Sequence, residues 1–180
     1  MSLLQGVLMR IRYAAAACAG LAVLASSTAC TVPEAGSTGI TVTADGLPVG
    51  VLMVCHHHID AAVLYTGDGD DGDESEDVGS WSRAEPATGF VTWPLRTGGG
   101  GWSVDRQPPA TLERQRTYIL HGGTEDNSWS TTAVSFTLAH LAALVPGRVR
   151  YFAGDVPGAD DDGYLTASVE EFRADACEDD

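Results

Sequence analysis

The sequence predicts a mainly β fold, an antiparallel β-sandwich with a short internal helix and a C-terminal helix. From residue 39 onward, apolar and polar residues alternate in short segments that end at Gly, Pro or Asp, and this period of two is typical of half-buried strands. Helix-capping signals appear later, at Thr137 and Ser168. We expect residues 39–180 to form a single β-sandwich domain, since about 150 residues are enough for one hydrophobic core.

The N-terminal segment, residues 9–30, predicts export. Arg10 and Arg12 precede an apolar run over residues 13–25, and small residues follow this run. The order is typical of a secretory signal, and the run is shorter than the roughly 20 apolar residues of a membrane-spanning helix. We therefore expect residues 1–29 to be removed as a signal peptide.

The four residues that end at Cys30, STAC, resemble the lipidation site of bacterial lipoproteins, in which the cysteine becomes the acylated N-terminus. Ser27 stands where that family usually has an aliphatic residue, and Ser27 with Ala29 also suits ordinary signal cleavage. The resemblance implies a lipid anchor at Cys30 on the extracellular face of the cell membrane, with a tether over residues 30–38. The alternative is a secreted protein.

Cysteine parity favours the anchor. Cys18 leaves with the signal peptide, so three cysteines would remain if Cys30 were not acylated. Acylation leaves Cys55 and Cys177 as an even pair, and an exported protein folds in an oxidising compartment. We predict one disulfide between Cys55 and Cys177.

The alternation of apolar and polar residues predicts where the strands lie in the first half of the chain. Between Val49 and Cys55, alternate side chains face opposite sides of a strand. Residues 67–77 are too charged and too rich in glycine to pack, so we expect a loop there. The strands predicted before residue 106 lie around residues 40–42 and at residues 49–55, 59–65, 78–83, 90–95 and 102–105.

Leu112 lies six residues before Tyr118, which opens a predicted strand over residues 118–122. This pattern resembles the tyrosine corner of immunoglobulin-like and fibronectin-like sandwiches, and the resemblance implies that the Tyr118 hydroxyl bonds to upstream backbone. A further strand is expected over residues 132–136.

The C-terminal third adds the helices. Thr137 is expected to cap a helix over residues 138–144, and residues 149–152 form a predicted edge strand. Ser168 and Glu171 form a capping box, and the helix that follows places Phe172 on its apolar stripe. We expect this helix to dock on the sandwich and to end near Cys177.

The segments SWS, TWPL and FTLAHLAALVPGRVRY resemble small uncharacterised lipoproteins of high-G+C Gram-positive bacteria. The resemblance covers about 140 residues, and it implies a shared fold and an envelope location. It carries no activity.

The net charge, the absence of Lys and the absence of known catalytic motifs exclude several classes of partner and enzyme. The formal net charge is −15, so phosphate backbones are repelled and we expect no nucleic-acid partner. The chain contains no Lys, which excludes a P-loop and a Schiff-base nucleophile. Nucleophile-elbow and zinc-protease motifs are also absent from the sequence.

The most chemically suggestive cluster is His56, His57 and His58 with Asp60. Imidazole and carboxylate groups suit zinc, copper or nickel. In an extended strand only alternate histidines share a face, so a third ligand would come from Asp60, His121 or His140. The alternative is a polar turn between strands.

Two other features have simpler interpretations. The acidic loop does not fit the EF-hand register, so it offers at most weak binding of a divalent metal. The four tryptophans, Trp81, Trp93, Trp102 and Trp129, are expected in the core and not on a glycan platform.

We therefore expect an exported, lipid-anchored cell-envelope protein that acts as a non-enzymatic binding or structural module. Its partner would be an envelope protein or a cell-wall ligand. The alternative is a metal-binding domain or metalloenzyme centred on His56 to His58.

Overall fold

The structure is a computed structural model that describes residues 31–67 and 75–178. The chain divides into residues 1–31 and residues 32–180, and only the second unit is considered below. The predicted signal peptide, the lipidation site at Cys30 and most of the acidic loop lie outside the described residues.

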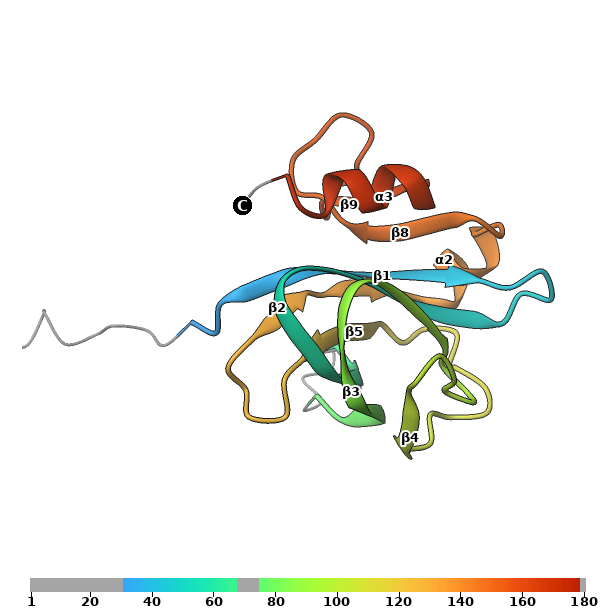
Figure 1. Cartoon of the computed structure of the whole chain (residues 1–180). Coiled ribbons are helices and arrows are strands. Elements are labelled where there is room, and N and C mark those ends of the chain that lie inside the picture. Colours follow the sequence, from blue (N-terminus) through green and yellow to red (C-terminus); the bar gives the residue numbers. More distant parts are fainter. Residues whose placement is uncertain (1–30, 68–74, 179–180) are drawn as a thin grey trace, which may run out of the picture. The chain divides into compact units, whose positions relative to one another are not determined.

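The described fold is mainly β, as predicted, and it contains two short helices (Figure 1). The helices are α2 (Leu138–Ala143) and α3 (Val169–Asp175). The strands are β1 (Glu34–Val42), β2 (Pro48–Thr66), β3 (Asp77–Pro94), β4 (Ser103–Arg106), β5 (Tyr118–Gly123), β6 (Ser130–Thr132), β7 (Val134–Phe136), β8 (Arg148–Phe152) and β9 (Tyr164–Ser168).

The strands form one continuous sheet in the order β4-β3-β2-β5-β6-β1-β8-β9, with β7 paired to β5. Strand β2 changes partners along its length. Its first half pairs with β1 and its second half with β5, while β3 follows it on the other edge. Because β1 also pairs with β6 in parallel, the sheet folds back on itself into a β-sandwich-like arrangement.

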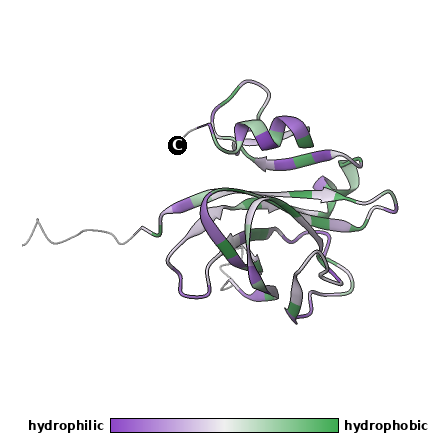
Figure 2. Cartoon of the chain, viewed as in Figure 1, coloured by the Kyte–Doolittle hydropathy of each residue, from purple (hydrophilic) through white to green (hydrophobic). Residues whose placement is uncertain are grey.

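Two apolar clusters hold the domain together, one on each face of β2. Leu52 and Val54 point into the larger cluster, whereas Val51 points into the smaller one, as the pleat of a strand requires. The smaller cluster lies under α3, where Phe172 is fully buried against Tyr151 of β8. Strand β8 carries both hydrophilic and hydrophobic residues (Figure 2), and its three central residues are buried.

Three of the four tryptophans lie in the core, as expected. Trp81, Trp93 and Trp102 are each no more than 4 % exposed, and the Trp93 ring centroid lies 4.7 Å from that of Trp102. Trp129 is half-buried and stacks on His57 with a centroid distance of 3.6 Å. These rings therefore do not form an exposed aromatic platform.

The predicted tether is wrong after residue 33, because residues 34–38 form the first half of β1. Ala35, Ser37 and Thr38 are buried there. A Cβ at Gly36 would clash with the carbonyl oxygen of Met53. The small residues that suggest a flexible segment are the ones that allow β1 to approach β2 closely.

Four predicted strands are in fact two long ones. Residues 49–55 and 59–65 both belong to β2, and residues 78–83 and 90–95 lie almost entirely in β3. The ladder between β2 and β3 is interrupted from Val54 to Ile59, where His57 has a φ of 54°. The bend therefore lies inside the strands and does not end them.

The second half of the chain has both predicted helices and an extra strand. Thr137 and Ser168 each cap a helix, as predicted. Both caps are complete capping boxes, and the one at Thr137, which uses His140, was not predicted. The predicted strand over residues 132–136 is two short strands, β6 and β7. Strand β9 was not predicted, and because it pairs with β8, residues 149–152 do not form the predicted edge strand.

The Tyr118 hydroxyl accepts a hydrogen bond of 2.9 Å from the backbone N–H of Glu113. This is the bond that the tyrosine-corner pattern implies. Leu112 packs against the larger apolar cluster, so the pattern fixes the loop that leads into β5.

Candidate binding groove

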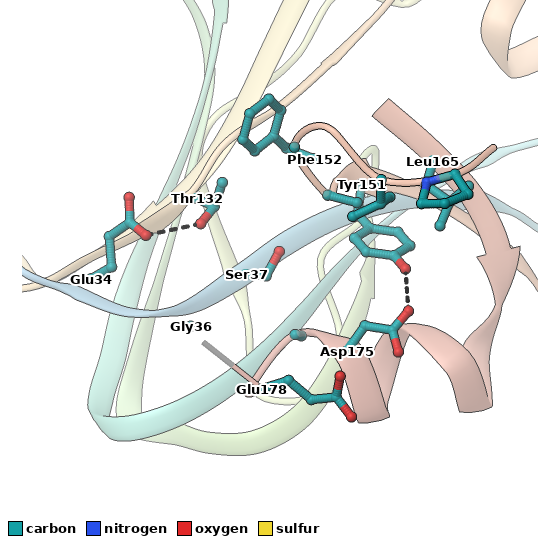
Figure 3. A pocket seen from close by; sticks show the side chains of 14 residues that line it. Glu34, Gly36, Ser37, Thr132, Tyr151, Phe152, Leu165, Asp175 and Glu178 are labelled. Carbon is teal, nitrogen blue, oxygen red and sulfur yellow. Dashed lines mark hydrogen bonds between the residues drawn. The ribbon is translucent and has the colours of Figure 1, made fainter. Parts of the chain in front are cut away.

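A groove of about 640 Å³ lies beside the first residues of β1. Gly36 and Ser37 of β1 form its floor, and Tyr151 and Phe152 of β8 form one wall (Figure 3). The end of α3 forms another wall. The remaining lining residues are Glu34, Thr132, Ala153, Gly154, Val156, Pro157, Leu165, Asp175, Ala176 and Glu178.

The groove exists because two strands share one edge of β1 and then separate. Ser37 is paired with Thr132 of β6, whereas Gly39 is paired with Tyr151 of β8. Strand β6 runs parallel to β1 and β8 runs antiparallel to it. The groove lies where β6 and β8 separate, above the buried floor residues of β1.

The predicted disulfide between Cys55 and Cys177 is confirmed, with the two Cα atoms 5.6 Å apart. It joins β2 to the segment just after α3. Asp175 at the end of α3, and Ala176 and Glu178 beyond it, line the groove. A covalent bond therefore holds the α3 wall against the sheet, and the groove is preformed.

Carboxylates give the groove a negative charge. Glu34 accepts a hydrogen bond of 3.1 Å from the Thr132 hydroxyl, and Asp175 accepts one of 2.7 Å from the Tyr151 hydroxyl (Figure 3). Glu178 adds a third carboxylate, and none of the described lining residues is Arg or His. The electrostatic field of the groove therefore favours a cation.

Burial raises the pKa of the Tyr151 hydroxyl, and the hydrogen bond to Asp175 raises it further. Tyr151 therefore stays protonated at neutral pH and keeps its role as the donor to Asp175. That bond fixes the orientation of the Asp175 carboxylate across the groove.

Ser37 is the unusual residue of the floor. It is 5 % exposed, and its hydroxyl has no hydrogen-bond partner within residues 31–67 and 75–178. Figure 3 shows the hydroxyl pointing away from β1, toward the space between Thr132 and Tyr151. Since buried polar groups are nearly always hydrogen-bonded, an unpaired hydroxyl at this place needs an explanation.

The structure does not bring the predicted metal ligands together. His56, His57 and His58 are exposed at the bend of β2. Asp60 accepts a hydrogen bond of 2.8 Å from the backbone N–H of Glu125. In the part of the chain that the structure describes, no three His, Cys, Asp or Glu side chains are grouped to hold a metal ion.

The two other histidines have local roles. His121 lies on β5 and meets the ring of Tyr65 edge-on, with a centroid distance of 5.9 Å. His140 completes the capping box of α2 at Thr137. In the second acidic segment, Asp160 lies 2.9 Å from the guanidinium of Arg150.

A second hollow, of about 400 Å³, is lined mainly by apolar side chains. It lies between the turn at Leu47, the segment around Pro108 and helix α2. Its lining includes Arg96 and no acidic residue, so its chemistry differs from that of the groove.

The sequence did not identify the groove residues. Glu34 and Ser37 were placed in a tether, and Tyr151 and Asp175 are paired only by the docking of α3. The predicted disulfide was the one available signal, because it places residues beside Cys177 next to β2.

Comparisons with known proteins give no relative: no family model, no curated protein and no solved structure matches the chain. The likeness to immunoglobulin-like sandwiches therefore stays a prediction. Among the described residues, no helix has the length and hydropathy needed to cross a membrane.

Proposed function

We propose that this chain is an exported, lipid-anchored cell-envelope protein whose domain is a non-enzymatic binding module. The observation that carries the proposal is the disulfide between Cys55 and Cys177. Disulfides persist in oxidising compartments outside the cytoplasm, and the predicted signal peptide leads to such a compartment.

The groove supports the binding part of the proposal. It combines carboxylates, hydroxyls and apolar side chains in one concave surface, which is the usual composition of a small-ligand site. Because the disulfide holds its α3 wall, little ordering is needed on binding, and a preformed site loses less affinity to entropy.

The anchor part rests on Cys30. Residues 31–33 alone separate Cys30 from the start of β1, so the proposed anchor leads into the domain through a short connection. A lipid at Cys30 would keep the protein on the outer face of the membrane.

The test of the anchor is mass spectrometry of the mature N-terminus after expression in a Gram-positive host, combined with membrane fractionation. We expect an N-terminal peptide that begins at an acylated Cys30 and a protein that stays with the membrane. Cys30→Ala is expected to release the protein or to leave its leader uncut. Cys18→Ala, a change within the predicted leader, is the matched control and should leave the anchor intact.

Two results would contradict the proposal. An unmodified Cys30 on a soluble, secreted protein would remove the anchor and leave export. A full-length protein in the cytoplasm, with Cys55 and Cys177 as free thiols, would remove export as well.

A further inference from the structure

We propose that the groove binds an alkylammonium group, that is, a protonated primary amine on an aliphatic chain; this inference rests on the proposed binding function. The ligand chemistry follows from three features of the lining: its carboxylates, its buried hydroxyl and its exposed apolar side chains. Each feature matches one part of such a ligand.

The carboxylates match the charge of the ligand. Glu34 and Asp175 each accept one hydrogen bond from a neighbouring hydroxyl, and an ionised carboxylate has about four acceptor sites. Each therefore keeps sites for further donors. An ammonium group supplies three N–H donors and no acceptor, whereas an anionic ligand would be repelled.

The Ser37 hydroxyl matches the donors of the ligand. It is buried at the floor and has no partner among the described residues, and it points toward the space between Thr132 and Tyr151, which both line the groove (Figure 3). An ammonium donor that reaches Ser37 would satisfy a buried acceptor that has no partner among the described residues. Ser37 is the observation that distinguishes this groove from an ordinary acidic surface.

The apolar wall matches the aliphatic chain. Phe152 and Val156 are 41 % and 39 % exposed, and both line the groove together with Pro157 and Leu165. A chain of methylene groups lying along this wall would remove apolar surface from water. A bare metal ion would leave the wall unused, and among the described residues no three His, Cys, Asp or Glu side chains are grouped to hold one.

An alkylammonium group has two natural sources, a free diamine and a lysine side chain of a peptide. The experiment measures both by isothermal titration calorimetry against the full mature protein with its disulfide intact. The probes are 1,5-diaminopentane and the peptide acetyl-Gly-Lys-Gly-amide. The uncharged controls are N,N′-diacetyl-1,5-diaminopentane and the same peptide with norleucine in place of lysine.

We expect saturable binding of at least one charged probe and no binding of its uncharged control. Asp175→Asn and Ser37→Ala should each weaken binding by about tenfold, since a hydrogen bond to a charged group has roughly that effect. Glu170→Gln on α3 is the matched control, because Glu170 does not line the groove, and it should change the affinity by less than about twofold. Unchanged thermal unfolding of Ser37→Ala would show that its effect is local.

The choice of probe decides the source. Binding of the diamine alone indicates a free amine, and binding of the lysine peptide alone indicates a peptide. Absence of heat with both charged probes overturns the inference, as does equal binding of the acetylated control or full binding by Asp175→Asn. If Cys30 is acylated and neither probe binds, the inference fails while the anchored module stands; an unexported protein overturns the proposed function itself.

Discussion

Gly50 of β2 lies directly against the ring of Trp93 on the neighbouring strand. A Cβ added to Gly50 would lie 2.5 Å from Cζ2 of Trp93, and Trp93 is fully buried between Trp81 and Trp102. The indole therefore occupies the volume that any other residue at position 50 would need. This contact fixes the register of β2 against β3.

Gly50→Ala is expected to destabilise the domain by about 1 to 3 kcal/mol, because overpacking a core forces neighbours off their preferred rotamers. Urea unfolding followed by tryptophan fluorescence measures the change. Gly123→Ala is the matched control, since a Cβ there would meet only the carbonyl oxygen of Trp129 at 3.5 Å. Equal destabilisation by both variants would contradict the role assigned to the Trp93 contact.

Removal of the disulfide by the double change Cys55→Ser and Cys177→Ser should lower the free energy of unfolding by about 2 to 5 kcal/mol. The bond closes a long loop, with a sequence separation of 122, so its loss frees much of the unfolded chain. Urea unfolding of the variant is compared with that of the wild type. The wild type in reductant should match the variant, and an unchanged midpoint in both would contradict the prediction.

Tyr118→Phe should cost about 1 kcal/mol, because the N–H of Glu113 loses its acceptor in a partly buried position. The aromatic ring and its contact with Phe136 are kept. Tyr164→Phe serves as control, since it keeps the ring that Arg150 and Phe152 contact, and it should have a smaller effect. The measurement is again the urea midpoint, and a neutral Tyr118→Phe would show that the corner bond adds no stability.

His121 should make stability depend on pH. Burial lowers the pKa of His121, although the charge of Asp77 partly opposes this. The unfolded chain therefore binds a proton at a higher pH than the folded protein. Stability from this group is present above about pH 6.5, the usual histidine value, and is lost as the pH falls through the lowered folded pKa.

The check is the free energy of unfolding at pH 7.5 and pH 5.5 in wild type and in His121→Phe, which keeps an aromatic ring beside Tyr65. The variant should lose less stability between the two values. His58→Gln, at an exposed site, is the control and should follow the wild type. A variant that declines as steeply as the wild type would assign the pH dependence to other groups.

Local signals predicted local structure well. Thr137 and Ser168 carry capping chemistry within four residues, and Tyr118 carries a bond to its own upstream loop, so each could be predicted from neighbours in the chain. The alternation around Leu52 correctly placed opposite faces of β2. The pairing of Cys55 with Cys177 followed from counting thiols.

The groove could not be predicted in this way, because its residues meet through pairings distant in sequence. Ser37 is a floor residue only because β6 and β8 separate along β1, and small residues near a predicted leader resemble a tether. The bend at His57 was predicted as a turn because polar residues between two apolar runs usually end a strand. The metal hypothesis needed a third ligand from His121 or His140. Whether either histidine lies near His56 to His58 depends on tertiary structure, which the spacing of residues in the sequence does not give.

The parallel pairing of β1 with β6 also affects the order in which the domain can form. Thr132 follows Glu34 by 98 residues, so the edge of β1 that β6 covers stays unpaired until most of the chain has been synthesised. Pairings of such long range slow folding and leave strand edges exposed. Until β6 is in place, β1 is therefore a strand with one open edge, the kind of edge at which chains aggregate.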